Sequence, residues 1–167
     1  GMVSAALAAD EKVQVPVDGG VSWIAATAGL GDDHWSASAS LLEGTHDLKV
    51  RVVNAVDNSG PETVRSYTLD TAAPTLAITS NASHLKIGES ATITFTFSED
   101  PGASFTLGDV TVGGGTLGPI SGSGLTRSAL FTPDAGTNGG AAGITVTHAS
   151  YTDAAGNSGG MGATPSV

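Results

Sequence analysis

Apolar and polar residues alternate with a period of two along much of the chain. The clearest case spans residues 90–98, where Ile93, Phe95 and Phe97 alternate with threonines. This alternation predicts a half-buried antiparallel strand whose threonines face the solvent. Shorter stretches of the same pattern predict further strands at Leu48/Val50/Val52, Leu76/Ile78, Val110/Val112 and Ile144/Val146.

Turn-forming residues separate these stretches, and several contain glycine next to Asp, Asn or Pro. Many short strands joined by such turns predict an all-β sandwich or barrel. Residues 37–43 are expected to form a strand, and the alanine-rich residues 2–10 are too short and uncapped for a helix. Expected turns include residues 18–20, 101–102, 113–115, 134–136 and 138–140.

Composition narrows the classes of partner. The chain of 167 residues has a net charge of −10 and only six basic residues, so it lacks the clustered Lys and Arg that nucleic acids or anionic membranes require. An acidic, loop-rich protein attracts a hard cation instead, above all Ca²⁺. The chain has no cysteine, so packing, metal binding or repetition must stabilise it. No apolar run reaches membrane-spanning length, which excludes membrane insertion in this segment.

A partial internal repeat indicates two modules. The loop containing Asp57 follows one predicted strand, and the loop containing Asp153 follows another, 96 positions later. That interval is the length of one small sandwich domain. Residues 67–74 lie between the two loops and predict a last strand, a short linker and a proline that opens the next module.

Motifs in this order resemble the bacterial immunoglobulin-like (Ig-like) tandem repeats of large surface adhesins, including the RTX type exported by type I secretion. The motifs are Asp18-Gly19 with Trp23, then residues 42–50 (LEGTHDLKV), residues 69–74 (LDTAAP) and residues 153–157 (DAAGN). The resemblance implies tandem Ig-like β-sandwich modules with antiparallel Greek-key sheets. It also implies an extracellular location, on the bacterial surface or secreted.

The motif positions give the expected domain organisation. Residues 1–11 are expected to be a tag remnant and disordered tail, and residues 12–70 the C-terminal part of a first module that lacks strands A and B. Residues 71–74 are expected to be a linker, and residues 75–167 a second module with an incomplete last strand. Incomplete sandwiches expose strand edges, which favours a strand-swapped dimer.

Five residues are candidate calcium ligands. In an Ig-like sandwich, the loops after strands B and F lie at the same end as the start of strand A. This topology gathers Asp70, Glu99, Asp100, Asp153 and Asn157, whose oxygens suit Ca²⁺. A second interpretation stays open, because Asp and Asn are also ordinary turn formers. The resemblance to calcium-rigidified repeats implies that calcium bound there would rigidify the junction between the modules.

Catalysis has little support in the sequence. The adjacent carboxylates Asp32–Asp33 and Glu99–Asp100 point to opposite sides of an extended chain and make no cooperating pair. His34, His46, His84 and His148 lack the spacing of a zinc site, and His148 is expected to be half-buried. Trp23 and Trp35 suit either the core or a sugar-stacking platform.

We therefore expect a non-catalytic extender of an adhesin, with neighbouring repeats of the same chain as its partners. A host or matrix ligand would bind elsewhere in the protein. The alternatives are a carbohydrate- or host-ligand-binding adhesion module and an accessory domain of a secreted hydrolase.

Overall fold

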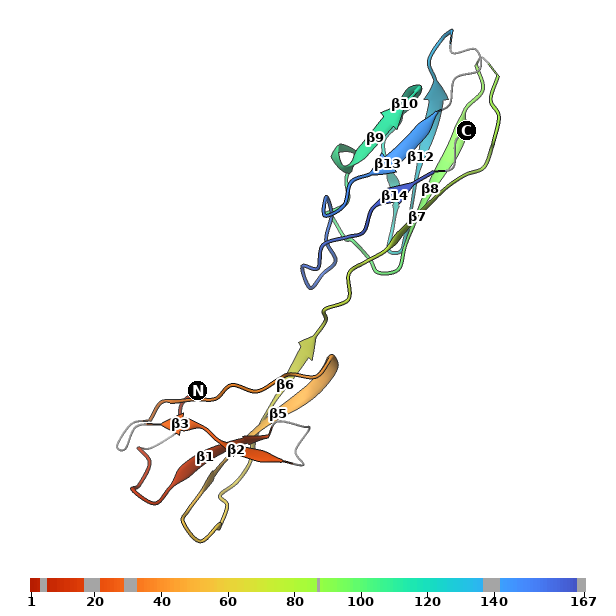
Figure 1. The fold of residues 1–167 in the computed structure, drawn as a ribbon. Coiled ribbons are helices and arrows are strands. Elements are labelled where there is room, and N and C mark those ends of the chain that lie inside the picture. The colour runs from red at the N-terminus through yellow and green to blue at the C-terminus, as the bar shows by residue number, and fades with distance from the viewer. Residues whose placement is uncertain (4–5, 17–21, 29–32, 87, 137–141, 165–167) are drawn as a thin grey trace. The chain divides into compact units, whose positions relative to one another are not determined.

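The computed structural model describes residues 1–3, 6–16, 22–28, 33–86, 88–136 and 142–164 (Figure 1). The chain separates into two compact units, Gly1–Asp70 (unit 1) and Thr71–Val167 (unit 2), and each is considered by itself. Asp32, the turns expected at residues 18–20 and 138–140, and the end of the expected last strand at 165–167 lie outside the described residues.

Unit 1 is built around an antiparallel sheet in the strand order β2-β1-β5-β6. The strands β5 and β6 form a hairpin whose residue pairs run without interruption from Gly44 opposite Leu69 to Val50 opposite Thr63. Val13, Val15 and Val53 are almost fully buried. The elements of unit 1 are β1 (Lys12–Pro16), β2 (Trp23–Ala25), β3 (Thr27–Ala28), β4 (Trp35–Ser36), β5 (Gly44–Val53) and β6 (Thr63–Leu69).

Two segments of unit 1 differ from expectation. The first residues, expected to form a disordered tail, contact the chain before β4: Met2 forms a bridge with His34, and the Val3 N–H donates to the Asp33 carbonyl at 2.8 Å. Residues 37–43 form no strand. Leu41 and Leu42 are each 47% exposed, so this stretch lacks the buried apolar face that holds a strand in a sheet.

Unit 2 is a two-layer sandwich. One sheet has the strand order β10-β12-β8-β7, with β11 also paired to β12, and the other has the order β14-β13-β9. The predicted fold class, an all-β antiparallel Ig-like sandwich, is confirmed. The elements of unit 2 are β7 (Leu76–Ser80), β8 (Ala91–Phe97), the 3₁₀ turn η1 (Leu107–Asp109), β9 (Val110–Gly113), β10 (Gly115–Leu117), β11 (Ser121–Ser123), β12 (Thr126–Pro133), β13 (Gly143–Val146) and β14 (Gly162–Ala163).

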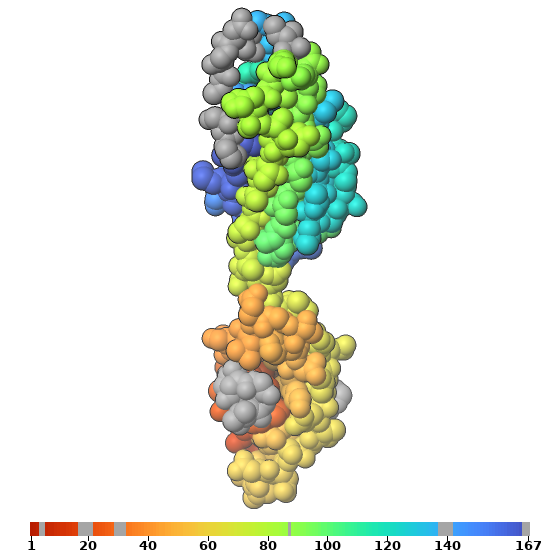
Figure 2. Space-filling view, turned by 90° about the vertical axis from the view of Figure 1, so that its right-hand side faces the viewer, coloured from red at the N-terminus to blue at the C-terminus, as the bar shows by residue number. Residues whose placement is uncertain are grey.

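The strand predicted at residues 90–98 is β8, and its alternation is confirmed. Ile93, Phe95 and Phe97 are at most 3% exposed, whereas Thr92 and Thr96 face the solvent. In Figure 2 the outer face of β7 and β8 (green) lies beside β12 (cyan). Period-two patterning therefore assigns this sheet its inner and outer faces.

Aromatic rings fill one end of the core of unit 2. The Phe105 ring centroid lies 4.9 Å from that of Phe97, 5.2 Å from Phe95 and 5.7 Å from Tyr151. Such edge-on and tilted pairs add stabilisation beyond the burial of their area. Phe105 and Tyr151 belong to the segments that follow β8 and β13, so their ring contact joins these two segments.

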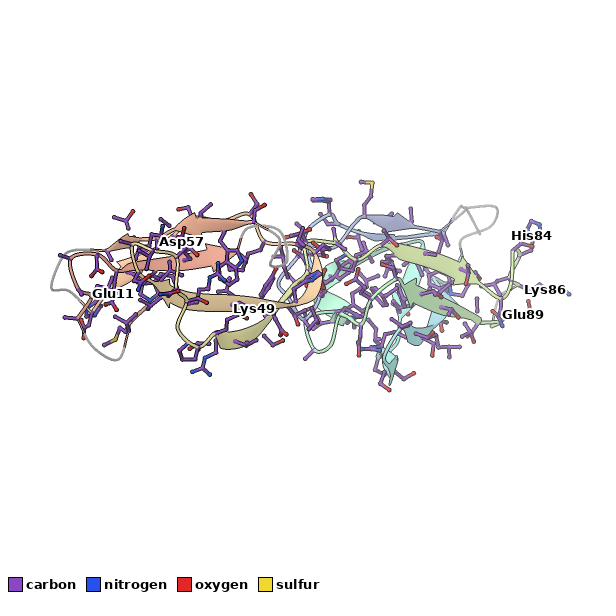
Figure 3. The ribbon with its side chains drawn as sticks, turned by 90° about the horizontal axis from the view of Figure 1, so that it is seen from below. Glu11, Lys49, Asp57, His84, Lys86 and Glu89 are labelled. Carbon is purple, nitrogen blue, oxygen red and sulfur yellow. The ribbon has the colours of Figure 1, made fainter. Side chains whose placement is uncertain are left out.

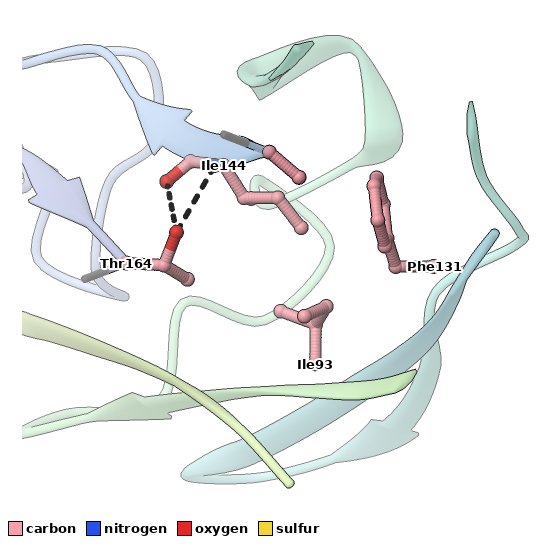
Figure 4. A pocket seen from close by; sticks show the side chains of 5 residues that line it. Ile93, Phe131, Ile144 and Thr164 are labelled. Carbon is pink, nitrogen blue, oxygen red and sulfur yellow. Dashed lines mark hydrogen bonds between the residues drawn. The ribbon is translucent and has the colours of Figure 1, made fainter. Parts of the chain in front are cut away.

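Isoleucines and Phe131 fill another part of the core, where Ile93, Phe131 and Ile144 line a small apolar pocket (Figure 4). Thr164 closes one side of it: the Ile144 N–H donates to the Thr164 hydroxyl at 3.1 Å. Because its lining is almost wholly apolar, this pocket is a packing feature of the core.

Candidate metal centre

Three of the five predicted ligands lie together in the structure. Asp70 follows β6, Glu99 follows β8, and Asp153 lies in the loop after β13. Each offers one carboxylate oxygen, and these oxygens all lie within 4.8 Å of one another. Residues from three distant parts of the sequence therefore meet at one point.

Asp153 is held by its own loop. Its Oδ1 accepts the backbone N–H of Asn157 at 2.9 Å, and its Oδ2 accepts the side-chain amide of Asn157 at the same distance. Desolvation raises the pKa of Asp153, but the hydrogen bonds from Asn157, Gly156 and Ala155 outweigh it and leave the pKa below its ordinary value. The buried Asp153 side chain is therefore a carboxylate at neutral pH.

Asp100 makes different contacts from the other predicted ligands. Its Oδ1 accepts the backbone N–H of Gly102 at 2.9 Å and pairs with Nη2 of Arg127 at 3.1 Å. The Gly102 hydrogen bond is the largest cause that lowers the pKa of Asp100. Desolvation comes next and opposes it, and the hydrogen bond and charge of Arg127 lower the pKa further. Asp100 thus anchors the loop that follows Glu99.

Arg127 is a buried residue of this region that the sequence analysis missed. Its Nη1 donates to the Gly124 carbonyl at 2.6 Å, and its Nη2 donates to the Gly102 carbonyl at 3.2 Å as well as to Asp100. The sequence did contain a signal for it. Arg127 has the same strand phase as the buried Ala129 and Phe131, and an arginine on the inner face of a strand requires several hydrogen-bond acceptors.

Ser104 joins the two loops that carry Glu99 and Asp153. Its hydroxyl accepts the backbone N–H of Thr152 at 3.0 Å, and its Oγ lies 2.6 Å from the Thr152 carbonyl oxygen. Thr152 directly precedes Asp153. This hydroxyl therefore ties the two loops together, beside the ring contact of Phe105 with Tyr151, and no sequence motif marks it.

A further support of the Asp153 loop is the packing of Tyr151 against a glycine. A Cβ atom on Gly159 would lie 2.2 Å from the Tyr151 ring, so only glycine fits against this face of the ring. Burial raises the pKa of the Tyr151 hydroxyl, which donates to the Pro74 carbonyl at 3.4 Å. The Gly160 N–H donates to the same carbonyl at 2.9 Å.

The loop that begins at Asn54 in unit 1 has the same backbone hydrogen bonds as the Asp153 loop of unit 2, but it has asparagine where unit 2 has Asp153. The Asn54 N–H donates to the Asn58 carbonyl, as that of Asp153 donates to the Asn157 carbonyl. The bridges between Val53 and Ser59 and between Thr152 and Ser158 also correspond. The predicted match of Asp57 with Asp153 is therefore wrong: Asn54 corresponds to Asp153, 99 positions away.

The candidate histidines and the remaining candidate carboxylates form no further metal-binding cluster among the described residues. Among the described residues, the trio of Asp70, Glu99 and Asp153 is the only group of three or more His, Cys, Asp or Glu side chains that could hold a metal ion. Figure 3 shows His84 in the loop between β7 and β8, beside Lys86 and Glu89. His148 is exposed rather than half-buried, because β13 ends at Val146 and the chain turns away.

Neither tryptophan forms a bare platform. The guanidinium carbon of Arg51 lies 4.0 Å from the centroid of the Trp23 ring, and Arg51 also donates to the Gln14 side chain. One face of Trp23 is thus occupied by a cation. Trp35 is half-buried, and its indole nitrogen is buried.

Comparison with known proteins gives one match. Residues 70–167 match a family model described as "Bacterial Ig-like domain". No curated protein and no solved structure matches the chain. The match begins at Asp70, so all three clustered carboxylates lie within the matched segment. In the described part of the chain, no helix is long and apolar enough to cross a membrane.

Proposed function

The chain belongs to the bacterial Ig-like domain family, and from this premise we propose that it is a non-catalytic extender of a bacterial surface or secreted adhesin. Large adhesins of the RTX type, to which its motifs are similar, are the proposed context. Stacked sandwich modules contact only their neighbours and convert sequence length into reach. The excess of acidic residues, with a net charge of −10, favours solubility in such an array.

Calcium is the proposed ligand of the Asp70, Glu99 and Asp153 carboxylates. Ca²⁺ binds oxygen ligands at about 2.3–2.6 Å, so two ligand oxygens on one ion lie at most about 5 Å apart. The 4.8 Å limit within the trio satisfies this condition. Three carboxylates form a hard oxygen donor set that suits Ca²⁺ better than softer metals. This clustering is the observation that supports the proposal.

The charge state of Asp153 also supports it. A carboxylate must be ionised to bind a cation, and the lowered pKa of Asp153 keeps it ionised at neutral pH. Without a cation, three neighbouring carboxylates repel one another. Binding of calcium removes this repulsion, so calcium should stabilise the folded protein.

The proposed consequence is a stiffer chain before β7. The Pro74 carbonyl is already fixed by Gly160 and Tyr151, and the Thr75 N–H donates to the Ser98 hydroxyl at 2.8 Å. A calcium ion that holds Asp70 to Glu99 and Asp153 would fix the chain on the other side of residues 71–73. Residues 71–73 would then lie between two fixed points of the chain.

Titration of the EDTA-treated protein with CaCl₂ tests the proposal by isothermal calorimetry and by scanning calorimetry. A calcium concentration 100 times the Kd should add about 2.7 kcal/mol to the stability of the folded state. For a domain of this size, that corresponds to a rise in Tm of about 10–20 °C. Mg²⁺ should act more weakly, because it demands a smaller octahedral shell.

Asp153→Asn keeps an oxygen for the loop hydrogen bond but removes the charge, so it should abolish both the heat and the rise in Tm. Asp57→Asn is the matched control, since Asp57 is an exposed carboxylate in the corresponding loop of unit 1. Small-angle scattering should show a narrower distance distribution for the wild type in calcium than in EDTA. If the wild type gives no heat and no change in Tm, the calcium site does not exist.

A further inference from the structure

The strand β6 is an unusually long and regular sheet edge. Its seven residues, Thr63–Leu69, pair with β5 without a bulge, and among the described residues it pairs with no other strand. The last strand of unit 2, β14, also pairs with a single neighbour but has only two residues. In an antiparallel edge strand, every second residue directs its N–H and C=O away from the sheet. The free side of β6 is therefore a template for another strand.

The residues of β6 carry few of the features that normally protect an edge. Proteins block edges with charges, prolines, bulges or short strands. β6 contains no proline and one charged residue, Arg65. All of its residues except Tyr67 and Leu69 are exposed, and Val64 is 47% exposed. The β5–β6 hairpin (tan to yellow) lies at the surface of unit 1 in Figure 2.

We propose that β6 is a homotypic interaction surface, which pairs antiparallel with β6 of a second copy of this chain about a two-fold axis at Ser66. In this register Arg65 lies opposite Tyr67 of the second copy, and Val64 lies opposite its Thr68. Arginine beside an aromatic ring and a β-branched pair are both favourable cross-strand neighbours. The two copies complement each other through the same residues, as a two-fold interface requires.

This register is favoured over its neighbours for two reasons. It pairs all seven residues of β6, whereas a shift by two residues in either direction pairs only five of them. One of these shifts also places Arg65 directly opposite Arg65 of the second copy, and like charges in that position are destabilising. The Ser66-centred register alone combines full length with no like-charge pair.

The net charge of unit 1 sets the conditions for pairing. Unit 1 contains ten acidic and four basic side chains, a formal charge of −6, so two copies repel each other at long range. Salt screens this repulsion, whereas the backbone hydrogen bonds of a paired edge depend little on salt. Association should therefore strengthen as the salt concentration rises. The local density of modules on a cell surface would favour it further.

Single cysteines test the register, because the chain has none of its own. In the Ser66→Cys variant, the two introduced cysteines lie directly opposite each other, with their Cα atoms about 4.5–5.5 Å apart, within the range of a disulfide. The matched variant is Thr68→Cys on the same face, where the two cysteines lie four residues apart along the strands, about 13 Å. Mild oxidation should give a disulfide-linked dimer of Ser66→Cys and at least tenfold less of Thr68→Cys.

Sedimentation velocity over a range of concentrations provides the second measurement. Ser66→Lys places two ammonium groups opposite each other only in the dimer, and should weaken association about fivefold or more. Thr92→Lys adds the same charge to the exposed face of an interior strand and should leave association unchanged. Tryptophan fluorescence confirms that unit 1 is folded in Ser66→Lys, since Trp23 and Trp35 both lie in unit 1, and scanning calorimetry confirms that unit 2 is folded in Thr92→Lys.

Three outcomes would overturn the inference. These are a wild type that stays monomeric at every concentration and salt level, equal cross-linking of the two cysteine variants, and a dimer that Ser66→Lys does not weaken. The experiments are run in EDTA, so they do not depend on calcium. Failure here therefore leaves the calcium proposal intact.

Discussion

Replacement of Ser104 by alanine is the sharpest test of how the two loops of the candidate metal centre are held. The Ser104 hydroxyl accepts the Thr152 N–H at 3.0 Å and donates to a backbone carbonyl, that of Thr152 at 2.6 Å or of Pro101 at 2.7 Å. Alanine removes one acceptor and one donor without adding volume. The Pro101 carbonyl keeps a partner, because the Ser104 N–H also donates to it.

The magnitude follows from the groups that lose partners. A buried donor left without an acceptor costs about 1–3 kcal/mol, and the half-buried Thr152 places the cost in the lower part of that range, about 1–2 kcal/mol. For a domain of about 100 residues, each kcal/mol lowers Tm by about 4–8 °C. The expected decrease for Ser104→Ala is therefore about 4–16 °C in the Tm of unit 2.

Scanning calorimetry in EDTA measures this change, and tryptophan fluorescence supplies an internal control. Both tryptophans belong to unit 1, so the fluorescence transition should stay where it is in the wild type. Ser121→Ala is the matched serine control. The Ser121 hydroxyl is exposed and contacts only Ser128, at 3.2 Å from its carbonyl oxygen and 3.3 Å from its hydroxyl, so the effect should be within about 0.5 kcal/mol. Equal effects of the two substitutions would refute the bridging role of Ser104.

Other substitutions and conditions have expected outcomes that follow from single contacts. Gly159→Ala should destabilise unit 2 by about 2 kcal/mol or more in urea titrations, because the Tyr151 ring occupies the space of a Cβ, whereas Gly113→Ala has room and should cost under about 1 kcal/mol. The pKa of Asp153 is lower in the folded than in the unfolded state, so its ionisation stabilises unit 2 at pH values above the unfolded pKa. This stabilisation is lost as the pH falls through the folded pKa. In EDTA, the stability of unit 2 should therefore hold down to about pH 5 and fall below about pH 4. Asp153→Asn should show a shallower fall, and an identical acid profile would contradict this assignment. Arg127→Lys should destabilise unit 2 in the same urea assay, because one ammonium group cannot replace the two arginine nitrogens that reach separate loops. Stability equal to that of the wild type would show that these hydrogen bonds contribute nothing.

Much of the fold could be predicted from the sequence, because a strand with one buried face shows apolar residues at every second position. In β8 every second residue is buried, so the strand and its inner face are both predictable. Residues 37–43 show the limit of this reasoning. Their position between Trp35 and the Glu43–Gly44 turn suggested a strand. A strand also needs a neighbouring strand to pair with, and local sequence does not encode that neighbour.

The candidate site was predictable to the extent that topology fixes it. Loops at one end of a sandwich must converge, which is why Asp70, Glu99 and Asp153 were identified together. The hydrogen bond from Gly102 to Asp100 fits the turn-former interpretation, but the ion pair of Asp100 was not predictable, because its arginine lies in β12, 27 positions away. The repeat register was wrong by three residues for a related reason: the loops correspond through backbone hydrogen bonds, and a shared aspartate is a weaker guide than a shared turn.

The correspondence between the loops at Asn54 and Asp153 has a consequence for how such proteins evolve. Asn54 accepts backbone N–H groups from Val56 and Asn58, so the amide supports its turn in the way that the carboxylate supports the other. Asparagine and aspartate codons differ by one base. A point mutation can therefore add or remove the acidic side chain while the turn keeps its shape. Under the proposal that calcium binds at Asp153, a gene made of duplicated modules could gain or lose a metal-bound junction at any position while each domain keeps its fold.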